Sequence, residues 1–126
     1  MHYIGNAHWF LPWLILLIGM YDVVRFARGY INETTFTKTD QRLVAVFSSL
    51  MDLQAALGLI FFLTTGLEGI GFPSNRILHG TIMFVAAVAP HLSSRWVGAD
   101  DQSRYLNNFF GILGSFLLML VGLSAI

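Results

Sequence analysis

The sequence contains no cysteine and very little charge. The absence of cysteine excludes disulfides, thiolate metal sites and cysteine nucleophiles. Only 11% of the 126 residues are charged, whereas soluble domains average about 25%. The formal net charge is zero, so nothing indicates a nucleic-acid partner. The chain also lacks a nucleophile–histidine–carboxylate set, a phosphate-binding loop and a carboxylate-rich metal site. We therefore do not expect an independent enzyme.

Long apolar runs occupy most of the chain, and 56% of the residues are hydrophobic. A helix that crosses the roughly 30 Å hydrocarbon core of a bilayer needs about 20 mostly apolar residues. Four stretches meet this length and predict one domain with membrane spans at about 7–26, 42–66, 75–96 and 105–125. Each run is continuous rather than alternating, which indicates helices and not barrel strands. The first run is interpreted as a permanent span, because no basic leader precedes it.

Short connections between the runs favour consecutive helices that lie side by side and antiparallel. We therefore predict an all-α fold, an integral membrane bundle of four helices that runs up, down, up and down. Asn6 is the expected N-cap of the first helix, and Thr39 or Asp40 that of the second. Pro90 lies inside the third span, so we expect a kink that frees the carbonyl of Ala86.

Lysine and arginine are distributed unevenly along the chain. Six of them flank the first and third connections: Arg25, Arg28, Lys38, Arg42, Arg95 and Arg104. Only Arg76 lies beside the second connection. Because positive charge collects on the cytoplasmic side of membranes, both termini are predicted to lie outside. Near the inner interface, the spacing of Asp22 and Arg25 predicts an i,i+3 ion pair.

Two histidines stand near the starts of the first and third spans, and ionisable groups at membrane depth require an explanation. In the predicted bundle, His8 and His79 lie at similar depth on diagonally opposite helices. Two such imidazoles could supply both axial ligands of one b-type haem. Each could instead be solvated or hydrogen-bonded to a neighbouring loop. A second bis-histidine haem does not fit, because His2 lies on the wrong side to partner His91.

Asp52 is the most unusual residue, since it lies about 15 Å inside the second span at the helical rise. We expect it to face the bundle interior or a partner subunit, with His91 as its nearest partner and Ser48 and Tyr21 within reach. An Asp52–His91 pair could relay a proton or orient the imidazole, or it could only fix the register of two helices. Gln54 points to a different face and could bind a backbone carbonyl, a cofactor propionate or a quinone.

Three segments resemble a bacterial family of small four-helix membrane proteins that are often labelled cytochrome b-like. The segments are TKTDQRL (37–43), DLQAALGL (52–59) and HGTIMFVA (79–86). The likeness extends over nearly the whole chain. It includes a histidine near the start of helix one, a Gln-x-x-x-Gly pattern in helix two and a His-x-x-x-Met pattern that opens helix three.

The resemblance implies a location in the bacterial cytoplasmic membrane. It also implies that His8 and His79 are the haem ligands, that Gln54 belongs to the cofactor site and that Met83 lines the pocket. Pro90 directly before the last histidine departs from the family pattern and argues against a role for His91 in ligation.

Almost no polypeptide is expected outside the membrane, so any activity must be intramembrane or shared with a partner. We therefore expect a subunit of a respiratory or photosynthetic electron-transfer complex that binds at most one b-type haem. Two alternatives stay open. One is a non-haem accessory or assembly subunit that stabilises a larger membrane complex. The other is a small transporter, built as a homo-oligomer, with Asp52 as the coupling carboxylate; no repeat or broken helix pair indicates it.

Overall fold

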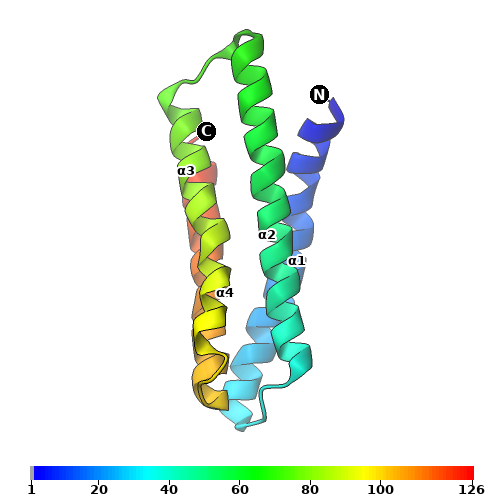
Figure 1. The fold of residues 1–126 in the computed structure, drawn as a ribbon, viewed down its shortest axis with the longest axis vertical. Coiled ribbons are helices and arrows are strands. Elements are labelled where there is room, and N and C mark those ends of the chain that lie inside the picture. Colours follow the sequence, from blue (N-terminus) through cyan, green and yellow to red (C-terminus); the bar gives the residue numbers. More distant parts are fainter. Residues whose placement is uncertain (1) are drawn as a thin grey trace.

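The computed structural model describes residues 2–126, and within them all regular secondary structure is helical (Figure 1). This confirms the predicted all-α class. The elements are α1 (His2–Asn32), α2 (Lys38–Thr65), a π-helical turn η1 (Gly66–Ile70), α3 (Ser74–Val88), a 3₁₀ segment η2 (Ala89–Trp96) and α4 (Asp101–Ser124).

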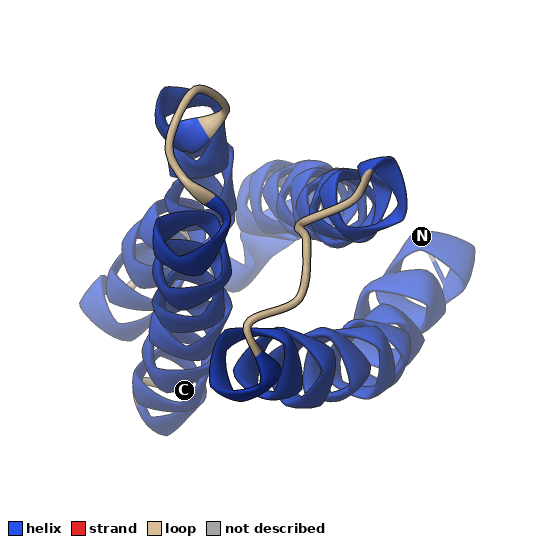
Figure 2. Ribbon diagram, turned by 90° about the horizontal axis from the view of Figure 1, so that it is seen from below, coloured by secondary structure: helices blue, strands red, loops and turns tan. Residues whose placement is uncertain are grey.

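The four long helices form one elongated bundle in which consecutive helices run in opposite directions (Figure 1). Helix α1 packs against α2 and α4, and α3 packs against the same two helices. Therefore α1 and α3 are diagonal to each other, as the view along the bundle also shows (Figure 2). Both chain termini lie at one end, which we call the terminal end; the loop between α1 and α2 lies at the opposite end, the loop end.

Three helical stretches are long and apolar enough to cross a membrane: His2–Asn32, Lys38–Ile70 and Asp101–Ser124. Only 22% of the most apolar window of each stretch is buried. The large apolar side chains therefore lie mainly on the outside of the bundle, where lipid would solvate them. The third predicted span does not reach this length as one α-helix, because α3 ends at Val88.

Pro90 explains the early end of α3. The α-helix changes to a 3₁₀ segment at Ala89, one residue before the proline. Proline has no N–H, so the carbonyl of Ala86 lacks its usual helical partner. The hydroxyl of Ser115, on α4, donates a hydrogen bond of 3.0 Å to that carbonyl and is fully buried. The predicted release of the Ala86 carbonyl is confirmed, with a change to 3₁₀ geometry at this point, and α4 supplies a donor.

The helix starts differ from the predictions. Helix α1 begins at His2, so Asn6 lies inside it and is not its N-cap. Helix α2 begins earlier than expected, and its N-cap is Thr37 rather than Thr39 or Asp40. The Asp40 carboxylate accepts a hydrogen bond of 2.8 Å from the Thr37 N–H, while the Thr37 hydroxyl oxygen accepts one of 3.3 Å from the Asp40 N–H. This reciprocal arrangement is a capping box.

Helix α4 is capped by Asp100. Its carboxylate accepts hydrogen bonds from the hydroxyl and the N–H of Ser103, at 2.7 and 3.1 Å. These two bonds lower the pKa of the exposed Asp100 carboxyl. Because the bonds favour the ionised form, the cap persists at neutral pH and is lost only in acid, as the pH falls through that pKa.

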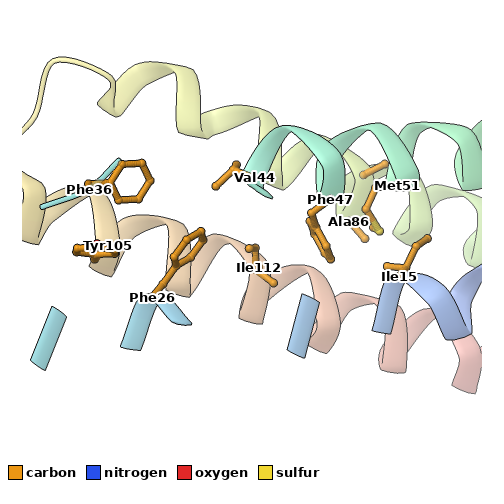
Figure 3. Close-up of a cluster of buried hydrophobic side chains, with 10 residues drawn as sticks. Ile15, Phe26, Phe36, Val44, Phe47, Met51, Ala86, Tyr105 and Ile112 are labelled. Atoms are coloured by element: carbon orange, nitrogen blue, oxygen red, sulfur yellow. The ribbon is translucent and has the colours of Figure 1, made fainter. Parts of the chain in front are cut away.

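The hydrophobic core fills the half of the bundle nearer the loop end (Figure 3). Helix α1 contributes a buried stripe with alternating spacings of four and three residues: Ile15, Gly19, Asp22, Phe26 and Gly29. The glycines allow aromatic rings to approach closely. A Cβ on Gly19 would lie 2.2 Å from the Phe116 ring, and one on Gly29 would lie 2.4 Å from the Tyr105 ring.

Candidate functional site

His8 and His79 lie at the same end of the bundle, because α1 and α3 both begin at the terminal end (Figure 1). At a rise of about 1.5 Å per residue, each is less than about 10 Å from the start of its helix. The fold therefore places both histidines at one end of the bundle and on diagonal helices, as predicted.

The His79 ring is held by the backbone of α4. Its Nδ1 lies 2.8 Å from the carbonyl oxygen of Gly122. A carbonyl only accepts hydrogen bonds, so Nδ1 carries the proton and donates it. The lone pair is then on Nε2, which is the arrangement typical of a metal-binding histidine.

His8 is positioned by two residues of α2 that are one turn apart. The side-chain Nε2 of Gln54 donates a hydrogen bond of 2.9 Å to the backbone carbonyl of His8. A Cβ on Gly58 would lie 2.8 Å from the His8 Cε1 atom, so only glycine leaves room for this ring. The Phe61 ring stacks on the imidazole with an interplanar angle of 16°. The Gln-x-x-x-Gly pattern therefore holds His8 in place.

Two polar atoms at this end lack partners among the described residues. The Nδ1 of His8 and the Oε1 of Gln54 are both buried and make no hydrogen bond. Buried polar atoms are seldom left without a partner, so this part of the bundle has unused capacity to bind a group. Of the three hydrogen-bond partners predicted for Gln54, the structure shows a backbone carbonyl, that of His8.

Met83 lies one helical turn beyond His79, as the His-x-x-x-Met pattern requires. Its side chain contacts α4, where a Cβ on Gly122 would lie 2.9 Å from the Met83 Cε. Gly122 therefore contacts both residues of the pattern. Its carbonyl accepts a hydrogen bond from His79, and its lack of a side chain leaves room for Met83.

None of the ten core residues lies in 2–14, in 52–85 or in 113–126. His8, Gln54, His79 and Met83 are all only partly buried. The terminal end of the bundle therefore contributes no residue to the fully buried hydrophobic core.

Asp52 and His91 are hydrogen-bonded, with Nε2 of the histidine 2.8 and 2.9 Å from the two carboxylate oxygens. The pairing is as predicted, but the two side chains are 52% and 53% exposed. They therefore lie on the outer surface of the bundle rather than in its interior. Ser48, one helical turn before Asp52, is buried and is not a partner of the carboxylate in the described structure. Tyr21 instead accepts a hydrogen bond of 3.2 Å from Arg25.

The predicted Asp22–Arg25 pair is wrong. Arg25 donates from Nε to the Asp40 carboxylate at 2.6 Å, and Asp40 is almost fully buried. The Tyr105 hydroxyl lies 3.2 Å from the same carboxylate. Both carboxyl oxygens of Asp22 are buried without a partner in the described chain. A Thr-x-x-Asp capping-box signature ahead of the second apolar run could have identified Asp40.

Among residues 2–126, no group of three or more His, Asp or Glu side chains is arranged to hold a metal ion. Comparisons of the chain with protein-family models, with curated proteins and with solved structures find no match.

Proposed function

We propose that the chain is an integral membrane subunit of an electron-transfer complex, and that it binds one b-type haem between α1 and α3. The observation that carries the proposal is the hydrogen bonding of the two imidazoles. The Gly122 carbonyl directs the lone pair of His79 to Nε2, while Nδ1 of His8 is buried without a partner. Both rings lie near the helix starts at the terminal end of the bundle.

His8 and His79 would hold the iron, and a bound haem would supply one-electron redox chemistry. The chain itself supplies orientation. The Gly122 carbonyl makes His79 a stronger ligand by accepting a hydrogen bond from its Nδ1–H, and Gln54 with Gly58 positions His8. Met83 lies beside His79 on the same side, where it would line the pocket. The termini would lie outside the cytoplasm, because Lys and Arg collect at the loop end.

The absorbance spectrum of the protein, purified in detergent from cells supplied with haem, tests the proposal. The wild type is expected to show a Soret band at about one haem per chain. His79→Ala and His8→Ala are each expected to lose most of it, because each removes an axial ligand.

His2→Ala is the matched control, since His2 is an exposed histidine on the same helix as His8. It is expected to keep the band. A wild type that is colourless but helical by circular dichroism would disprove haem binding.

A second candidate, a non-haem accessory subunit, is favoured by the outward-facing Asp52–His91 pair. A half-exposed carboxylate about 21 Å from the start of α2 would meet lipid in an isolated bundle, which is costly. A partner subunit that covers this face would remove that cost.

The double substitution Asp52→Ala with His91→Ala is expected to release the chain from its complex without unfolding it. Native electrophoresis of gently solubilised membranes would show the wild type in a large species and the variant as a free chain. Leu120→Ala, at another exposed site, is the control and should co-migrate with the wild type. A wild type that itself migrates as a 14.1 kDa monomer would count against an accessory role.

A further inference from the structure

A second site lies at the loop end, far from the histidines. A pocket of about 330 Å³ opens between the last turns of α1, the loop that follows it and the start of α4. Its polar lining consists of Tyr21, Arg25, Arg28, Asn32, Thr34 and Tyr105. The ring of Tyr105 packs against α1 because Gly29 has no side chain there.

The pocket is positively charged. Its lining contains two arginines and no acidic side chain. Arg25 is already neutralised by Asp40, to which it donates at 2.6 Å. Arg28 is exposed, and no hydrogen bond or ion pair engages its guanidinium within residues 2–126. The Arg28 guanidinium is therefore available to bind a ligand.

The neutral lining groups add hydrogen-bond donors. The Tyr21 hydroxyl accepts a hydrogen bond from Arg25 Nη1 at 3.2 Å, so its own proton is available to donate elsewhere. Asn32 brings an amide NH₂ to the same pocket. A planar guanidinium beside such donors matches a phosphate group, which has several acceptor oxygens and negative charge.

The surface next to the pocket is apolar. Leu17, Tyr21, Val24 and Arg28 follow one another at spacings of four, three and four residues and so share one face of α1. Leu17 is 69% exposed and Val24 is 51% exposed. This face is apolar toward the middle of the bundle and basic at its end, which is the polarity of a phospholipid lying along the helix.

We propose that this pocket binds the phosphate head group of an anionic phospholipid, with Arg28 as the main charge partner and the acyl chains along Leu17 and Val24. The site rests on the proposed membrane insertion and not on haem binding. The predicted cytoplasmic position of the loop end agrees with it, because the cytoplasmic leaflet carries anionic lipid.

Native mass spectrometry of the protein in detergent, titrated with phosphatidylglycerol or phosphatidylcholine, tests the proposal. The wild type is expected to bind phosphatidylglycerol about tenfold more tightly, which corresponds to about 1.4 kcal/mol. Arg28→Gln is expected to lose this preference. Arg95→Gln, which removes an exposed arginine outside the pocket lining, is expected to keep it.

Equal affinity for the two lipids would overturn the proposal, as would an equal loss in the Arg28 and Arg95 variants, which would indicate general surface charge. A third titration with sodium phosphate separates the two sources of phosphate. Displacement of the lipid by millimolar phosphate would overturn the lipid assignment. A haem-free preparation leaves the test valid, because lipid binding is what is measured.

Discussion

Replacing Asp40 by alanine is expected to lower the free energy of unfolding by about 3 kcal/mol. The carboxylate is nearly inaccessible and accepts hydrogen bonds from Arg25 and from the Thr37 N–H. A hydrogen bond to a charged group contributes about 1.5–3 kcal/mol, and the capping box also loses its bond from the Thr37 N–H, whereas the Thr37 side chain still caps the helix. The Tyr105 hydroxyl would also lose a neighbouring acceptor.

Unfolding in mixed micelles with increasing dodecyl sulfate would measure the difference. Asp101→Ala is the matched control, because Asp101 also lies in the first turn of a helix but makes no side-chain hydrogen bond in the described structure. Its effect should be within about 0.5 kcal/mol. An equal loss of stability in the two variants would mean that the hydrogen bonds of Asp40 do not stabilise the loop end.

Gly19→Ala is expected to destabilise the bundle by about 2 kcal/mol, within the range known for overpacked cores. The added methyl group would lie 2.2 Å from the Phe116 ring and 2.8 Å from the Phe47 ring. Phe47 is fully buried, so the rings have little room to move. Helix α1 would have to shift away from its neighbours.

The same substitution at Gly114 is expected to stabilise the bundle instead. No atom lies within 4 Å of a Cβ built there, so alanine gains about 0.5–1 kcal/mol of helix propensity without a clash. Thermal unfolding followed by circular dichroism would compare the pair. Equal midpoints for the two variants would mean that α1 does not pack closely at Gly19.

The number, order and class of the helices were predictable because each depends on a continuous apolar run. The residues at which the helices begin were less predictable. Helix α1 extends five residues before the predicted start at residue 7, because a helix continues through polar residues that a hydropathy pattern excludes. The cap at Thr37 was missed for the same reason: the capping box precedes the apolar run.

The candidate site was predicted only in outline. The sequence indicated His8 and His79 from their positions at two helix starts, and Asp52 as the partner of His91. The roles of Gln54 and Gly58 in positioning His8 depend on contacts between helices. Each residue turns a helix by about 100°, so a small error in rotation moves a side chain to another face. Of the two predicted positions for Asp52, in the bundle interior or toward a partner subunit, the exposed side chain excludes the first.

By itself, the sequence determined four apolar helices and one interrupted hydrogen bond, at the carbonyl that Pro90 leaves free. Only the tertiary structure decided which groups meet. Ser115 reaches that carbonyl, and Arg25 binds Asp40 rather than Asp22, which is closer in the sequence. Local chemistry establishes that a donor or a charge needs a partner. The identity of the partner depends on how neighbouring helices are rotated and staggered, which is settled by packing across the whole bundle.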